Sequence, residues 1–202
     1  LDEIKLISVD TPASVEVYTN QKFQSPPFPP LELYLIGRKY RPVRARLDNG
    51  KDVLAKLARR DGRYVDDFPL GSRPGVAQLH TLELEFADQV PANKAVLVLV
   101  GWTDWADGST YLGVAQETSH GLQFPRLDAL RDDGVWETLV ENTGVPSGYP
   151  RPIVVDLRGK LRGGRPVLRL VTNMCLYWDE AFLAELVTDL APRQTELRSQ
   201  AA

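Results

Sequence analysis

Residues 79–86 read LHTLELEF and residues 95–100 read AVLVLV, and these two stretches decide the fold class. In the first, Leu82, Leu84 and Phe86 alternate with polar residues. This pattern is typical of an antiparallel strand with one face in the core and the other in water. The second stretch is apolar throughout and predicts a central strand covered on both faces. Together they indicate a layered, mainly β protein.

Shorter β-type runs continue in both directions from these two stretches. They occupy residues 4–9, 15–18, 31–36, 111–116, 136–140, 153–157 and 167–172. Turn sequences such as Asn49-Gly50 and Gly163-Gly164 stand between them. About ten short strands with this spacing predict an antiparallel β-sandwich of the jelly-roll type.

Two segments depart from this pattern. Residues 178–190 (WDEAFLAELVTDL) carry apolar side chains at helical spacing and predict a short C-terminal helix. Residues 24–30 (QSPPFPP) contain four prolines and predict an extended connector outside any sheet. We therefore expect an N-terminal hairpin and Pro-rich connector over residues 1–30, and a β-sandwich domain with its C-terminal helix over residues 31–202.

Composition narrows the classes of function. The chain has 202 residues, of which 43% are hydrophobic and 25% charged, and its net charge is −3. This balance argues against a nucleic-acid partner, which requires a concentrated basic face. The longest apolar run is too short for insertion into a membrane. Cys175 is the only cysteine, so no internal disulfide can form, and we expect it to be a small buried side chain.

The segment 101–110 (GWTDWADGST) follows the most apolar strand and is the first candidate site. Trp102 and Trp105 can form a flat platform for a sugar ring or an aliphatic chain. Asp104 and Asp107 can bind hydroxyl groups or ligate calcium. The alternative is structural: one tryptophan closes the end of the core, and the aspartates accept turn hydrogen bonds from backbone amides.

The segment 172–179 (TNMCLYWD) is the second candidate. In the functional interpretation, Asn173, Tyr177 and Asp179 form a binding edge. In the structural interpretation, Asn173 holds a neighbouring loop, because a buried amide must be paired.

The sequence offers no convincing catalytic site. Its two histidines, His80 and His120, have no nucleophile at a spacing that predicts a catalytic pair, and Ser119 is adjacent to His120. No nucleophile elbow, phosphate loop or zinc-ligand spacing is present. We expect a protein that is not an enzyme and that needs no cofactor and no metal.

An ordered set of segments resembles a known family. The segments are 6–23 (LISVDTPASVEVYTNQKF), 48–53 (DNGKDV), 61–71 (DGRYVDDFPLG), 97–116 (LVLVGWTDWADGSTYLGVAQ), 136–161 (WETLVENTGVPSGYPRPIVVDLRGKL) and 168–182 (LRLVTNMCLYWDEAF). In this order they resemble the C-terminal region of bacterial FG-GAP repeat proteins that carry an ASPIC/UnbV segment. The extension after Phe182 departs from the family pattern.

The resemblance implies part of a larger exported protein, extracellular or periplasmic, beside a β-propeller. It implies adhesion, scaffolding or ligand binding rather than catalysis. The propeller repeats and their calcium loops are absent from this sequence, so calcium binding is not carried over.

Three functions follow as hypotheses. The first is a binding module, with a glycan as the candidate ligand. The second is a structural domain that docks on or caps a protein partner or an adjoining domain such as the propeller. The third, and the least supported, is a hydrolase that acts on glycans.

Overall fold

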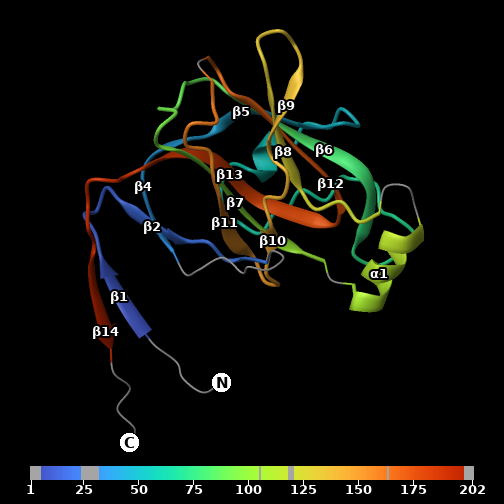
Figure 1. Cartoon of the computed structure of the whole chain (residues 1–202), viewed down its shortest axis with the longest axis horizontal. Helices are drawn as coiled ribbons and strands as arrows, with labels where there is room; N and C mark the ends of the chain where they lie inside the picture. Colours follow the sequence, from blue (N-terminus) through green and yellow to red (C-terminus); the bar gives the residue numbers. More distant parts are fainter. Residues whose placement is uncertain (1–5, 24–31, 105, 118–120, 163, 198–202) are drawn as a thin grey trace, which may run out of the picture.

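The computed structural model describes residues 6–23, 32–104, 106–117, 121–162 and 164–197 (Figure 1). These residues form two five-stranded antiparallel sheets. The first sheet has the order β11 (Arg151–Asp156), β7 (Ala95–Thr103), β13 (Leu176–Leu186), β4 (Leu33–Tyr40) and β2 (Glu16–Thr19). The second has the order β5 (Pro42–Leu47), β6 (Val76–Phe86), β12 (Val167–Met174), β8 (Arg126–Leu130) and β9 (Trp136–Val140). The predicted mainly β, antiparallel architecture is confirmed.

The main core lies between the two sheets. Leu97 and Leu99 of β7 and Leu82 and Leu84 of β6 are buried in it. The alternation predicted for residues 79–86 is confirmed, because Leu82, Leu84 and Phe86 face this core while the glutamates between them are partly exposed. Burial of these side chains is the main stabilising term of the sandwich.

A second core lies on the other face of the first sheet. Val96 and Val98 of β7 and Phe182 of β13 are fully buried there. The sheet curls so that its two edge strands meet, and the Asn20 side chain after β2 bonds to the backbone of Val154 in β11. The central strand β7 is therefore covered on both faces, as its unbroken apolar sequence predicts.

The predicted C-terminal helix at residues 178–190 is wrong, because residues 178–186 belong to the strand β13 and residues 187–190 follow it without helical structure. β13 pairs with β7 on one side and β4 on the other, and nearly all of its residues are buried. A strand with two apolar faces has apolar residues at helical as well as alternate positions, so periodicity does not distinguish the two structures.

The α-helix of the described part of the chain lies elsewhere. The segment α1 (Gly108–Glu117) occupies the place of the strand predicted at residues 111–116, and a single turn of 3-10 helix, η1 (Leu54–Lys56), follows β5. Among the described residues, neither helix has the length and apolar character needed to cross a bilayer.

The N-terminal strands do not form the predicted hairpin with each other. β1 (Leu6–Asp10) pairs with β14 (Arg193–Leu197), whereas β2 joins the first sheet beside β4. The β1–β14 ribbon projects from the body of the molecule (Figure 1). A short pair, β3 (Lys22–Phe23) with β10 (Val145–Pro146), completes the fold. The Pro-rich connector at residues 24–30 lies outside the described residues.

Candidate functional site

A continuous series of ring contacts runs from the interior to the surface beside the first sheet. Trp102 of β7 and Tyr177 of β13 are cross-strand partners, and their rings stack with centroids 4.4 Å apart. Tyr177 contacts Phe68 at 5.2 Å, and Phe68 stacks on the buried His80 at 4.6 Å. At the outer end, Tyr64 meets Trp102 edge-on at 6.1 Å. We call these five side chains the aromatic ladder.

The position of Trp178 explains why Tyr177 faces Trp102. Neighbouring residues of a strand point to opposite faces, so Trp178 enters the sandwich core while Tyr177 faces the other way. Gly101 pairs with Trp178, and a Cβ at Gly101 would lie 2.7 Å from the indole. The missing side chain of Gly101 thus lets β13 approach β7 closely enough for the ladder to stack.

Two hollows open on either side of the outer end of the ladder. The first has a volume of about 630 Å³ and is lined by Ala55, Lys56, Gly62, Arg63, Tyr64, Asp66, Trp102 and Tyr177. The second has a volume of about 620 Å³ and is lined by Tyr64, Trp102, Thr103, Asp104, Gly148, Tyr149 and Pro150. Because Tyr64 and Trp102 line both, they form a wall between them. We call the two hollows together the aromatic groove; each has the size of a small-ligand site.

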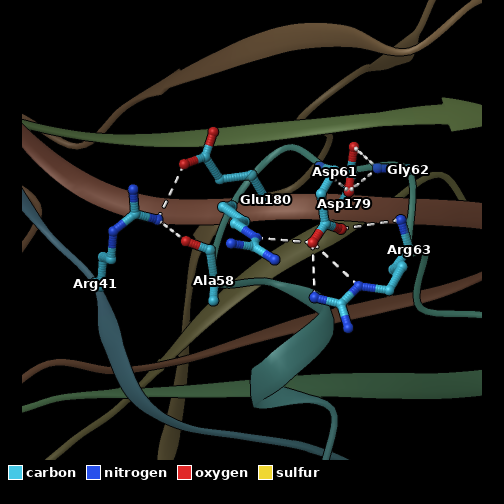
Figure 2. Close-up of polar contacts among 8 residues, drawn as sticks. Arg41, Ala58, Asp61, Gly62, Arg63, Asp179 and Glu180 are labelled. Atoms are coloured by element: carbon cyan, nitrogen blue, oxygen red, sulfur yellow. Dashed lines mark hydrogen bonds and ion pairs between the residues drawn. The ribbon is translucent and has the colours of Figure 1, made fainter.

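A buried carboxylate holds the loop that carries Tyr64. Asp179 is 1% exposed and lies at a β-bulge in β13. Its oxygens accept the backbone N–H groups of Asp61, at 3.1 Å, and Gly62, at 3.0 Å (Figure 2). Gly62 has a φ of 79°, which favours glycine at this turn. In the structure, the Asp179 carboxylate therefore supports this turn.

Ion pairs brace the same loop from outside. The Asp61 carboxylate lies between the guanidinium groups of Arg63 and Arg59, at 2.7 and 2.9 Å. Hydrogen bonds from these two arginines hold the pKa of Asp61 well below its usual range. Between β4 and β5, Arg41 forms an ion pair with Glu180 at 3.0 Å and also donates to the Ala58 carbonyl (Figure 2).

The candidate residues of segment 101–110 lie in different places in the structure. Trp102 is half-buried in the wall of the groove, and Asp104 lines the second hollow. Asp107 instead caps α1, because its Oδ1 accepts the backbone N–H of Thr110 at 2.7 Å, which is the turn role given above as the alternative. Trp105 lies outside the described residues, so the two-tryptophan platform is not tested.

Asn173 lies away from the groove and binds a loop. Its Oδ1 accepts the backbone N–H of Gln123 at 2.7 Å, and its Nδ2 donates to the Gly121 carbonyl at 2.9 Å. These contacts are those of the structural interpretation. Of the second predicted segment, only Tyr177 reaches the aromatic groove.

The reactive side chains singled out in the sequence lie in the interior or outside the described residues. His80 is 5% exposed, and burial lowers its pKa, so the imidazole is neutral at pH 7. Burial raises the pKa of the Cys175 thiol to about 11, as expected for a core cysteine. His120 is not among the described residues. Within the described part of the chain, no His, Cys, Asp and Glu side chains gather as a metal site would require.

Sequence reasoning missed Tyr64 and Tyr149, which complete the groove. Each follows a turn: Tyr64 comes two residues after Gly62, and Tyr149 stands between Gly148 and Pro150. An aromatic residue directly after a turn is the only signal that could have found them. Burial raises the pKa of Tyr64, so this phenol is neutral at pH 7.

Comparison with known proteins adds no assignment. No family model matches the chain, and no curated protein is similar to it in sequence. The groove geometry is therefore the main basis for a functional proposal.

Proposed function

We propose that this chain is a non-catalytic binding module that holds a glycan in the aromatic groove. The observation that carries the proposal is Tyr149, which is 83% exposed beside the wall formed by Tyr64 and Trp102. A large ring held in water next to two further rings is a surface that a ligand would cover.

The chemistry of the groove suits a sugar. One face of a pyranose ring is a sheet of C–H groups that packs on an aromatic ring, while its hydroxyl groups point outward. Asp66 in the first hollow and Asp104 in the second supply carboxylate acceptors for such hydroxyl groups. The rings supply contact area and the carboxylates supply orientation.

The setting we propose is extracellular or periplasmic. It rests on the resemblance of the ordered sequence segments to the exported FG-GAP and ASPIC/UnbV proteins. A rigid β-scaffold with an aromatic groove, beside a propeller in a longer chain, is suited to surface adhesion.

The test is a glycan array followed by calorimetric titration of the best oligosaccharide. We expect saturable binding by the unchanged protein and a loss of about tenfold or more in Tyr149→Ala, because the variant loses the apolar area that the ring buries as well as about 1 kcal/mol of stacking. Tyr149→Phe keeps the ring and should keep most of the affinity. Leu130→Ala, an exposed apolar residue at the end of β8, is the matched control.

Two results would contradict the proposal. One is the absence of saturable binding to every glycan class on the array. The other is binding whose affinity is the same in Tyr149→Ala and in Leu130→Ala.

A second candidate function, docking on a protein partner, is favoured by the β1–β14 ribbon. Leu6 and Leu197 face each other across the ribbon and are 63% and 48% exposed. Ile7 and Val9 line a mainly apolar hollow of about 850 Å³ between the ribbon and the first sheet. In the described part of the chain, β1 has β14 as its only neighbouring strand.

For this second candidate we propose a second copy of the chain as the partner. Antiparallel pairing of β1 with β1 about Ser8 sets Ile7 beside Val9 of the other copy, with no like charges opposed. Ser8→Lys would oppose two lysines at the centre of that pair, so it should abolish a dimer seen by light scattering. Ser14→Lys, in an exposed turn, should leave it intact. A monomer at all concentrations would contradict this candidate.

A further inference from the structure

The loop at residues 58–64 is fixed to the first sheet at both of its ends. At one end, Ala58 forms an antiparallel bridge with Glu180. At the other, the backbone N–H of Val65 donates to the Trp178 carbonyl at 2.8 Å. Between these points, the buried carboxylate of β13 holds the turn, as Figure 2 shows. The loop is therefore preorganised rather than shaped by a ligand.

Holding the loop in this way requires two buried charges, which by themselves lower the stability of the fold. Asp179 and Glu180 are successive carboxylates and both are buried. Removing two like charges from water side by side destabilises a fold unless each is paired and hydrogen-bonded. Here one is satisfied by backbone amides of the loop and the other by Arg41. Bulges with re-aimed side chains are common beside functional sites, and the bulge at Asp179 directs its carboxylate to this loop.

The loop presents three arginines at the edge of the aromatic groove. Arg59 and Arg63 have side chains that are 71% and 62% exposed, and Arg63 lines the first hollow. Arg60 donates from Nη2 to the Pro150 carbonyl at 3.0 Å, and Pro150 lines the second hollow next to Tyr149. Guanidinium groups thus flank both sides of the wall.

The positive charge of this loop exceeds its negative charge. Asp61 is the carboxylate that Arg59 and Arg63 share. Arg60 makes no ion pair in the described part of the chain, and its contact is a neutral carbonyl. A guanidinium has five N–H donors, so donors remain on this edge after these contacts are made.

Both hollows have an arginine and a carboxylate beside them. Arg63 and Asp66 line the first hollow, where Asp66 pairs with Lys56. Asp104 lines the second hollow, and Arg60 reaches its edge through the contact with Pro150. The carboxylates of an acidic oligosaccharide would bind at the arginines, and its hydroxyl groups would point towards Asp104. An arginine fork matches the planar geometry of a carboxylate.

We propose that the aromatic groove selects acidic glycans, in which one uronic acid carboxylate binds at Arg63 beside the first hollow and another at Arg60 beside the second, while the sugar rings cover Tyr149 and Trp102. This inference rests on the proposed function and adds the class of ligand. The two arginines are the specificity-determining residues.

The test compares an oligogalacturonate with its fully methyl-esterified form, which keeps the same sugar chain without the charge. Calorimetric titration should show the acidic oligomer binding about tenfold more tightly or better, because hydrogen bonds to a charged group contribute about 1.5–3 kcal/mol. Its affinity should fall with added salt, whereas that of the ester should not.

Variants separate the arginines from the rings. Arg60→Gln combined with Arg63→Gln should bring the ratio of the two affinities to about one, the value for a site that no longer senses the carboxylate. Arg165→Gln is the matched control, since Arg165 is exposed and lines a separate hollow beside the β8–β9 hairpin. It should keep the unchanged ratio.

The outcomes distinguish the two proposals. Equal affinity for acid and ester in the unchanged protein, or an acid preference that survives the double substitution, overturns the acidic selectivity and leaves the glycan groove standing. If neither oligomer binds while the array identifies a neutral glycan, the selectivity is again overturned. If no glycan of any class binds, the proposed function fails and this inference fails with it.

Discussion

Gly101 lies directly against Trp178 across the β7–β13 ladder. A Cβ at this position would contact the Tyr177 carbonyl oxygen and lie 2.7 Å from the indole. The indole is 3% exposed and belongs to the sandwich core, so it has little room to move away. A single absent side chain therefore sets the distance at which the aromatic ladder forms.

We expect Gly101→Ala to lower the free energy of unfolding by about 1–3 kcal/mol, because the new methyl group overpacks a filled site. Equilibrium urea unfolding measures the change. Gly108→Ala is the control: Gly108 begins α1, and a Cβ there meets no atom within 4 Å. Equal losses in the two variants would show that the contact with Trp178 is unimportant.

His80 provides a prediction of pH dependence. Burial lowers its pKa, so the folded protein favours the neutral imidazole. Its stabilising contribution is complete above the ordinary pKa of about 6.5 and is lost as the pH falls through the lowered folded value. We expect the stability of His80→Gln to change less with pH over this range, as followed by urea unfolding at successive pH values. His120→Gln should retain the pH dependence of the unchanged protein. If stability became independent of pH in His120→Gln and not in His80→Gln, the prediction for His80 would be contradicted.

At the scale of the elements, β13 shows where local pattern is insufficient. Residues 178–190 have apolar side chains at positions typical of an amphipathic helix, and nothing within the segment excludes one. The segment is a strand because β7 and β4 both pair with it and two separate cores cover its faces. Those partners are distant in sequence, so tertiary context overrides the local preference.

The outer face of the second sheet carries a row of alternating charges across its strands. In the register of the sheet, Arg46 of β5 lies opposite Glu83 of β6, and Glu83 lies opposite Arg169 of β12. Arg169 in turn lies opposite Asp128 of β8. Asp128 is 1% exposed and receives hydrogen bonds from Arg169, at 2.8 Å, and from Arg126, at 2.9 Å. Opposite charges directly across a sheet stabilise its register.

Asp128 should contribute to stability in a pH-dependent way. Burial by itself would raise its pKa, but hydrogen bonds from Arg126, Arg169 and Thr138 outweigh burial, and the pKa is lowered. The contribution is therefore complete above the ordinary pKa of about 3.9 and is lost as the pH falls through the lowered value.

We expect Asp128→Asn to cost about 2 kcal/mol at neutral pH, as measured by urea unfolding, because charged hydrogen bonds are lost. The difference from the unchanged protein should shrink below about pH 4. Asp88→Asn, which alters an exposed pair with Arg38 at 3.8 Å, should have little effect at any pH. A cost for Asp128→Asn that is constant from neutral to acidic pH would contradict the role of its charge.

At the scale of the whole molecule, closure of the first sheet determines where the second core lies. The Asn20 amide lies between the edge strands: its Nδ2 donates to the Val154 carbonyl at 3.1 Å, and its Oδ1 accepts the Val154 N–H at 3.2 Å. The backbone N–H of Gln21 donates to the Pro152 carbonyl at 3.0 Å. One side chain thus replaces a neighbouring strand at the point of closure.

We expect Asn20→Ala to lower the free energy of unfolding by about 1–3 kcal/mol, because it leaves the buried backbone groups of Val154 without partners. Hydrogen exchange of the Val154 amide should become faster while exchange in the second sheet is unchanged at the same residual stability. Asn93→Ala, at an exposed residue before β7, is the control. Protection of Val154 that persists in Asn20→Ala would mean that the sheet closes without this amide.

The candidate site was predictable only in part. Trp102, Asp104 and Tyr177 could be identified because they cluster in two unusual segments of the sequence. Tyr64 and Tyr149 could not, since each stands alone in its own turn, far along the chain from the other. Their meeting depends on the loop contacts of Asp179, a residue whose sequence position suggested a ligand contact.

The alternating and apolar stretches of the chain were sufficient to determine a mainly β, antiparallel, layered protein with a buried central strand and a core cysteine, because these features depend on which side chains avoid water along a single strand. Only the tertiary structure decided that β13 is a strand, that the N-terminal strands pair with distant partners, and that separate turns meet at one groove. Those outcomes depend on pairing between segments far apart in sequence, which local side-chain patterns do not encode.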